Sequence, residues 1–182
     1  MREISLHLLD IAENSVAAGA TKVEITVEED LVHDRLRISV RDDGKGMDED
    51  LASRAADPFV TSRTTRKVGM GIPLLQAAAE ACNGSLTIAS EPVQGTTLHV
   101  EFQHSHVDRM PLGDLGGTWL ALTIGFPQTH WIFRYRLNGA EFVFDDEPVK
   151  RALDGIPLTE PDVLTFIRVS LERGIANVQS RQ

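Results

Sequence analysis

The sequence predicts an α+β fold, in which helices form one layer on a β-sheet, followed by a smaller α+β unit. Two features of the residue pattern predict the first part. Apolar residues recur at helical spacing over 3–18 and 72–81. Strands are predicted over four further segments, 22–28, 35–40, 85–90 and 96–102. This mixture of helices and strands indicates a two-layer α/β sandwich over the first hundred residues.

Glycines and polar runs mark where these elements end. Gly19 suits the position after a helix C-terminus, and Asn83-Gly84 closes the second helix. The run Asp-Asp-Gly-Lys-Gly at 42–46 stops the second strand. Residues 48–68 are polar and lack periodicity. We therefore predict an exposed loop there.

A linker at 103–106 divides the chain into a first domain, 1–103, and a second unit, 104–182. Aromatic residues concentrate in the second unit, where they suit either the core face of a hairpin or a binding surface. The histidines of the linker, His104 and His106, have a spacing compatible with a metal pair. No carboxylate or cysteine cluster accompanies them, which favours an ordinary linker.

The second unit is predicted to contain a β-hairpin and helices. Asn138-Gly139 separates the alternating runs 131–137 and 140–145. A type I′ turn needs positive φ at both central residues, so this dipeptide predicts a hairpin. Pro161 favours the first turn of a helix that is expected to end near Arg173, before Gly174.

Composition excludes several classes of protein. Apolar residues make up 42% of the 182 residues and charged residues 25%, as in soluble globular proteins. A net charge of −9 argues against general binding to nucleic acid or to an anionic membrane. No apolar run approaches the roughly 20 residues of a membrane span, so we expect a cytoplasmic protein. The single cysteine, Cys82, excludes an intrachain disulfide and is expected to be buried in a helix.

Three short segments could carry chemistry. Asp10 and Asn14 lie four residues apart and project to the same side of the first helix, where a carboxamide oxygen suits Mg²⁺. Asp42, before the glycines of 42–46, could accept a hydrogen bond from an exocyclic amine such as that of adenine. Gly69-Met70-Gly71 enters a helix whose free N–H groups favour a phosphate. Taken singly, each segment is also explained as a solvated helix face or an ordinary turn.

In their order and spacing, these segments and Gly95-Thr96-Thr97 resemble the N, G1, G2 and G3 boxes of the GHKL ATPase superfamily. This superfamily contains gyrase, heat-shock chaperones, histidine kinases and mismatch-repair ATPases. The stretch 13–25 is especially similar to the mismatch-repair MutL version of the N box. The resemblance covers about residues 3–102 and implies the Bergerat type of α/β sandwich.

The resemblance also implies a site for ATP and Mg²⁺. Segment 57–63 is similar to the one that precedes the ATP lid in histidine kinases, with Arg63 where lysine is usual. Mg²⁺ is then expected at Asn14, and adenine at Asp42. The residues expected to bind the nucleotide are Asn14, Asp42, Gly44, Gly46, Thr61, Arg63, Lys67, Gly69, Gly71, Thr96 and Thr97.

One departure from the family pattern concerns the general base. Members that hydrolyse ATP place a glutamate four residues before the asparagine, where this chain has Asp10, whose side chain is one methylene shorter. Asp10 is therefore expected to act more weakly as the catalytic base, so that the protein is either a slow ATPase or a phosphotransferase. His7 could orient Asp10, although a surface histidine is the simpler expectation, and Glu13 points elsewhere.

Three functions remain open from the sequence. The first is a Mg-ATP-binding domain that transfers phosphate to a protein partner in trans. The second is a slow ATPase switch that uses Asp10, and the third is a nucleotide sensor without catalysis. The exposed edge of the hairpin also suggests a homodimer.

Overall fold

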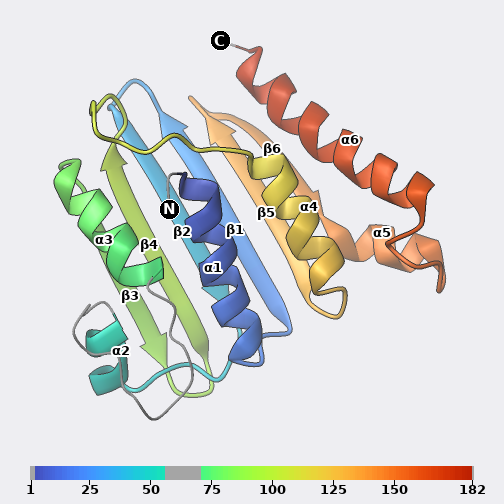
Figure 1. Cartoon of the computed structure of the whole chain (residues 1–182), viewed down its shortest axis with the longest axis horizontal. Coiled ribbons are helices and arrows are strands. Elements are labelled where there is room, and N and C mark those ends of the chain that lie inside the picture. The colour runs from blue at the N-terminus through green and yellow to red at the C-terminus, as the bar shows by residue number, and fades with distance from the viewer. Residues whose placement is uncertain (1–2, 56–70, 182) are drawn as a thin grey trace.

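The computed structural model describes residues 3–55 and 71–181. Their elements follow the order α1 (Ile4–Ala17), β1 (Lys22–Asp30), β2 (Arg35–Asp42), α2 (Glu49–Ala55), α3 (Gly71–Ala81), β3 (Ser85–Glu91), β4 (Gly95–Gln103), α4 (Leu115–Gly125), β5 (His130–Leu137), β6 (Ala140–Asp145), α5 (Asp146–Leu153) and α6 (Pro161–Gln179). The α+β sandwich predicted from the sequence is confirmed. Figure 1 shows the main helices lying on one face of the sheet.

One six-stranded sheet, in the order β3-β4-β2-β1-β5-β6, runs through the molecule. All neighbouring strands are antiparallel except β1 and β5, which pair in parallel with Val23 opposite Trp131. The predicted hairpin β5–β6 therefore extends the sheet of the first hundred residues and does not form a sheet of its own. The domain boundary after residue 103 stays a prediction.

Aromatic side chains of the second unit fill the core between the sheet and α4. Trp119 stacks on Phe133 with ring centroids 5.0 Å apart, and Trp131 stacks on Phe133 at 5.8 Å. All three side chains are fully buried. The sequence left open whether the aromatic residues form a core or a binding surface, and these three belong to the core. They bury much apolar area, and burial of this kind is the main favourable term in folding.

The segment that leads into α4 also supports the start of α1. The backbone N–H groups of Ile4 and Ser5 donate to the carbonyls of Pro111 and Leu112, at 3.0 and 2.9 Å. The first N–H groups of a helix have no partner within the helix, so these bonds take the place of a cap. Residues of the second unit thus hold the helix that carries Asp10 and Asn14.

Helix α2 and the C-terminal end of α6 differ from the sequence prediction. Residues 49–55 of the predicted loop form α2, which starts where Asp48 Oδ1 accepts from the N–H of Leu51 at 2.8 Å. No residue of α2 is buried, so no apolar pattern marked it. Helix α6 continues past Gly174 to Gln179. Gly174 therefore lies inside the helix, where a Cβ would overlap the ring of Phe142, so the glycine serves packing and does not end the helix.

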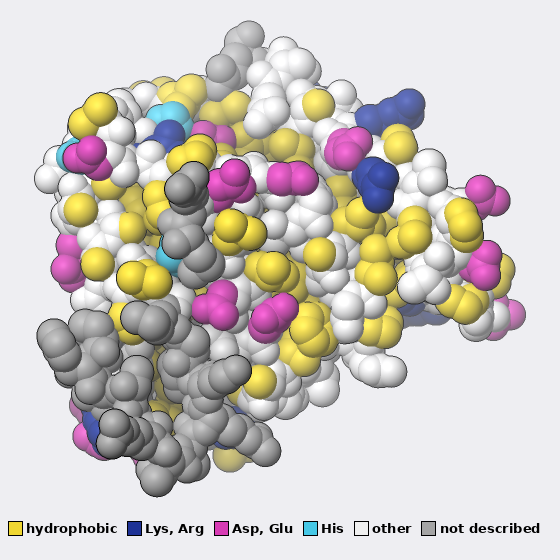
Figure 2. Space-filling model, in the orientation of Figure 1, with side chains coloured by type: hydrophobic (Ala, Val, Ile, Leu, Met, Phe, Trp, Pro, Cys, Tyr) yellow, Lys and Arg dark blue, Asp and Glu magenta, His cyan; other side chains and the backbone are white. Residues whose placement is uncertain are grey.

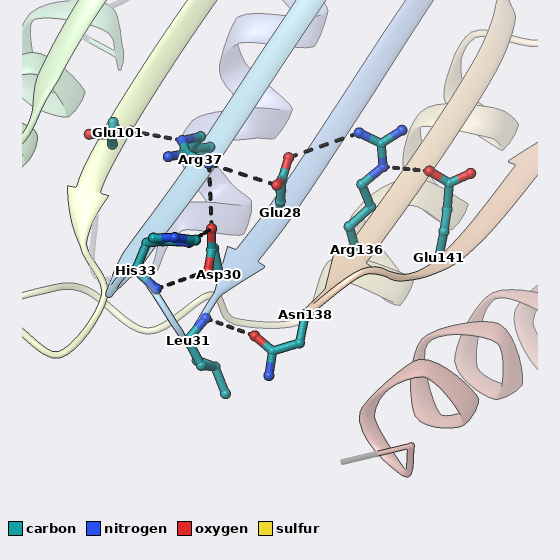
Figure 3. Close-up of polar contacts among 9 residues, drawn as sticks. All are labelled: Glu28, Asp30, Leu31, His33, Arg37, Glu101, Arg136, Asn138 and Glu141. Carbon is teal, nitrogen blue, oxygen red and sulfur yellow. Dashed lines mark hydrogen bonds and ion pairs between the residues drawn. The ribbon is translucent and has the colours of Figure 1, made fainter.

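Charged side chains join the strands on the face of the sheet away from the helices (Figure 3). Arg37 on β2 reaches Glu101 on β4 at 2.9 Å and Glu28 on β1 at 3.8 Å. Arg136 on β5 reaches Glu28 at 3.9 Å and also Glu141 on β6. This chain of ion pairs crosses five strands and links the hairpin to the first part of the sheet.

Within residues 3–55 and 71–181, none of the helices combines the length and the apolar character needed to cross a membrane.

Candidate functional site

Most of the predicted site residues that the structure describes lie around the C-terminal half of α1, the end of β2 and the start of β4, towards the lower end of the sheet in Figure 1. Asp10 and Asn14 lie on α1, and Asp42 is the last residue of β2. Strand β4 begins beside it, with Thr96 opposite Asp42 in the register. Gly71 is the first residue of α3. Segments far apart in the sequence thus meet around the C-terminal half of α1.

The carboxylate of Asp42 is held by three donors from three segments. Ser15 Oγ donates to Oδ2 at 2.6 Å, while the N–H groups of Gly44 and Thr96 donate to Oδ1 at 2.9 and 3.2 Å. A carboxylate has about four acceptor positions, so one position remains for a further donor. The carboxylate is fixed in place by this arrangement. Ser15 was not singled out in the sequence, although it is the immediate neighbour of Asn14.

Two glycines let the backbone segments of the site touch. Gly46 has φ +65°, and a Cβ on it would overlap the carbonyl oxygen of Glu91. Gly95 has φ +90°, and a Cβ on it would overlap the carbonyl oxygen of Asp42. Both positions therefore require glycine for space as well as for conformation. The predicted glycine-rich loop packs against the turn between β3 and β4.

Asp43, taken as a variable position in the sequence, has a structural role. Its carboxylate accepts from the N–H and Oγ1 of Thr21 and from the N–H of Lys22, at 2.7, 2.6 and 2.9 Å. Partial burial acts to raise the pKa of Asp43, but these hydrogen bonds outweigh it and hold the pKa below its ordinary value. Asp43 thereby fastens the loop after α1 to the end of β2.

Asn14 has the features expected of a ligand-binding side chain. Its Nδ2 is buried and has no hydrogen-bond partner among the described residues. A buried amide without a partner is costly in a folded protein, so a bound group that satisfies it is expected. The carboxamide oxygen of the same side chain is of the type that Mg²⁺ accepts. The residues present thus fit a Mg-nucleotide at this end of α1.

Asp10 lies against the first residue of α3. A Cβ placed on Gly71 would overlap Oδ2 of Asp10, and the nearest atoms that it would meet all belong to Asp10. His7, one turn earlier on α1, is 2% exposed, so the expectation of a surface histidine was wrong. Burial lowers the pKa of His7, and a hydrogen bond with the backbone of Gly71 opposes this in part.

The side chains of Thr96 and Thr97 lie on different faces of the sheet. Thr97 follows Thr96 on a strand, so its side chain lies on the opposite face of the sheet, beside Arg41 in the register. There it lines a hollow of about 1130 Å³ that extends over β3 and that Asp42 and Gly95 also line, whereas Asp10 and Asn14 do not. The remaining predicted residues lie outside the described part of the chain: Thr61, Arg63, Lys67 and Gly69.

A family model described as "Histidine kinase-, DNA gyrase B-, and HSP90-like ATPase" matches residues 2–106. Curated relatives agree with it. A putative sensor histidine kinase NtrY-like from Rickettsia conorii is 27% identical over 109 residues, which cover 59% of this chain and 18% of the relative. Sensor protein kinase FleS from Pseudomonas aeruginosa is 36% identical over 89 residues, which cover 49% of this chain and 22% of FleS. The matches thus span about a fifth of each relative.

Two solved structures share the fold well beyond residue 106. The N-terminal domain of a DNA repair protein has a TM-score of 0.57 at 14% identity, covering 79% of this chain and 52% of its own. The Aquifex aeolicus MutL ATPase domain complexed with ADP has a TM-score of 0.51 at 13% identity, and the match covers 95% of this chain and 70% of that domain. At these identities the likeness concerns the fold alone.

Proposed function

Because this chain belongs to the family of histidine kinase-, DNA gyrase B- and HSP90-like ATPases, we propose that it binds ATP with Mg²⁺ and transfers phosphate to a protein partner in trans. The observation that carries the proposal is the convergence of Asn14, Asp42 and Gly71 at one end of the sheet. Together these three residues would supply a magnesium ligand, an acceptor for adenine and a helix N-terminus for phosphate within one site.

Asp42 supports the adenine end of the site. Its carboxylate is held by Ser15, Gly44 and Thr96 and retains room for one more donor. The exocyclic amine of adenine is such a donor. A guanine in the same place would present a carbonyl oxygen, which an ionised carboxylate repels. Selectivity for ATP over GTP is therefore part of the proposal.

Asn14 and Gly71 support the phosphate end of the site. When bound, Mg²⁺ would neutralise charge on the phosphates. Asn14 would hold the metal through its carboxamide oxygen, and the N–H groups at the start of α3 would donate to phosphate oxygens. Arg63 belongs to this proposal because segment 57–63 resembles the segment that precedes the ATP lid in histidine kinases, and Lys67 belongs to it as a cation nearby in the sequence that would neutralise phosphate charge.

The setting of Asp10 favours transfer over hydrolysis. A general base must reach the attacking water, and here the carboxylate packs against Gly71. The slow ATPase remains the second candidate, because Asp10 and Asn14 share one stripe of α1. The acceptor is expected to be a protein, as the sensor kinases among the relatives suggest. A cytoplasmic location, and a homodimer through the edge strand β6, complete the proposal.

The proposal is tested with γ-labelled ATP and Mg²⁺, using wild type, Asn14→Ala and the matched control Asn177→Ala on the exposed face of α6. Calorimetry should show ATP binding that is lost in Asn14→Ala and kept in the control. The same proteins are then incubated with a dialysed extract of the source cells. Labelling of another protein by wild type and by the control, but not by Asn14→Ala, would support transfer. Repeated release of free phosphate would establish the ATPase instead, and ATP binding with neither product would establish a sensor. No binding at all would refute the proposal.

A further inference from the structure

Ser90 belongs to a row of three side chains that crosses the sheet at the proposed adenine end of the site. In the strand registers, Asp42 on β2 lies opposite Thr96 on β4, and Thr96 lies opposite Ser90 on β3. Residues directly opposite each other in paired strands present their side chains on the same face of the sheet. Val40 and Leu98, two residues away on β2 and β4, are buried on that face. The row therefore lies on the face that the helices cover.

The hydroxyl of Ser90 makes three hydrogen bonds. Its Oγ accepts from the N–H of Met47 at 2.8 Å and donates to the carbonyl oxygen of Gly95 at 3.0 Å. The third bond, of 2.8 Å, joins it to Oγ1 of Thr96. A serine hydroxyl has one hydrogen and two acceptor lone pairs. These three contacts use its whole capacity.

The number of hydrogens fixes the direction of the bond between Ser90 and Thr96. The carbonyl of Gly95 can only accept, so it takes the single hydrogen of Ser90. Met47 fills one lone pair of Ser90 Oγ and leaves the other for a second donor. Thr96 then supplies its own hydroxyl hydrogen to Ser90. The Thr96 oxygen keeps lone pairs alone, and it offers them beside the carboxylate of Asp42.

Two neighbouring acceptors select the chemistry of the group that they bind. In this arrangement neither the carboxylate of Asp42 nor the oxygen of Thr96 has a hydrogen to give. The exocyclic amine of adenine carries two hydrogens and can donate to both. Hypoxanthine has a carbonyl oxygen in place of the amine, which would meet lone pairs only. Because polar groups left unpaired in a site are costly, the two acceptors favour adenine.

We propose that Ser90 is a positioning residue that determines base specificity: by taking the hydroxyl hydrogen of Thr96, it keeps that oxygen an acceptor for the amine of adenine. This inference rests on the proposed function, in which adenine is bound at Asp42. Ser90 acts through Thr96 and does not touch the base. Its removal should therefore change the choice between two bases more than it changes nucleotide binding in general.

The test compares Mg-ATP with Mg-ITP, the hypoxanthine nucleotide. Affinities are measured by calorimetry with wild type, Ser90→Ala, Ser90→Thr and the matched control Ser85→Ala, at the exposed start of the same strand. Wild type should prefer ATP. In Ser90→Ala the hydroxyl hydrogen of Thr96 is free to turn to the carbonyl of hypoxanthine, so the preference for ATP should fall roughly three- to tenfold. Ser90→Thr keeps a hydroxyl and should keep the preference, as should the control.

A second variant tests whether the effect passes through Thr96. Thr96→Val removes the hydroxyl and keeps a branched side chain of similar shape. In that background Ser90→Ala should leave the preference for ATP unchanged, because no hydroxyl hydrogen remains to be released. A further fall of the preference in the double variant would overturn the route through Thr96.

Other results would also overturn the inference. If Ser90→Ala weakens ATP and ITP binding by the same factor, Ser90 only holds Met47 against β3. If wild type binds ATP and ITP equally, or if Ser90→Ala changes neither affinity, the two acceptors do not select the base. If wild type binds neither nucleotide, the proposed function fails and the inference fails with it. Binding of ATP by wild type therefore separates the two failures.

Discussion

Ser15 Oγ donates a 2.6 Å hydrogen bond to Oδ2 of Asp42 and so ties α1 to the end of β2. Ser15 is adjacent to Asn14, the residue proposed to hold Mg²⁺, while Asp42 is proposed to bind adenine. The two ends of the proposed nucleotide site are therefore joined by one short bond.

Replacing Ser15 with alanine should weaken ATP binding. Without the hydroxyl, Oδ2 of Asp42 loses its partner and the carboxylate is held from one side only, so a three- to tenfold loss of affinity is expected. Calorimetry with ATP measures the loss. Ser170→Ala on α6, where the hydroxyl bonds within its own helix, is the matched control. Unchanged affinity in Ser15→Ala would show that Gly44 and Thr96 hold Asp42 without help.

Replacing Gly71 with alanine should destabilise the protein through Asp10. Residue 71 is the first of α3, where the helix preference of alanine counts less than in a helix interior, and its Cβ would overlap Oδ2 of Asp10. The Asp10 side chain has to rotate away, so a net loss of about 1 kcal/mol is expected. Combining it with Asp10→Ala should remove most of that loss. Urea unfolding of both single variants and the double variant gives the coupling energy. Gly125→Ala, where a Cβ meets nothing within 4 Å, is the control. Additive effects would disprove the contact.

Replacing Trp119 with alanine should affect the nucleotide site from a distance. Trp119 is fully buried and stacks on Phe133, so truncation is expected to cost about 3–5 kcal/mol. Helix α4 packs on α1, and ATP affinity should fall together with stability. Phe166→Ala, at a side chain that is 58% exposed, is the control and should change both by little. Full ATP affinity in a destabilised Trp119→Ala would show that α1 is held independently of α4.

His7 should make stability depend on pH. Its pKa in the folded protein lies below the ordinary value of 6.5, so between these two values the unfolded chain binds more protons. The contribution is fully present above about pH 6.5 and is lost as the pH falls towards the folded pKa. The free energy of unfolding, measured with urea between pH 7 and pH 5, should fall less steeply in His7→Gln than in wild type. His99→Gln, at an exposed histidine on β4, is the matched control and should keep the slope of wild type. An identical slope in His7→Gln would contradict a buried, neutral His7.

Local signals in the sequence determined much of the fold and part of the site. Asn138-Gly139 predicted the hairpin because its turn conformation depends on two adjacent residues, and both have positive φ in the structure. The spacing of the motifs predicted the family, and the α+β sandwich is confirmed. Such features depend on neighbours a few residues apart, which the sequence displays directly.

Only the tertiary structure decided how distant segments meet. The parallel pairing of β5 with β1 joined the hairpin to the main sheet, and a pairing across more than a hundred residues leaves no local pattern. Pairing of β4 with β2 placed Thr96 opposite Asp42 and left Thr97 on the other face of the sheet, although both threonines belong to one motif. Ser15 gained its role from its partner Asp42 on β2. The sequence by itself thus determined the elements and the chemical groups, whereas contacts between elements decided which of those groups share a site.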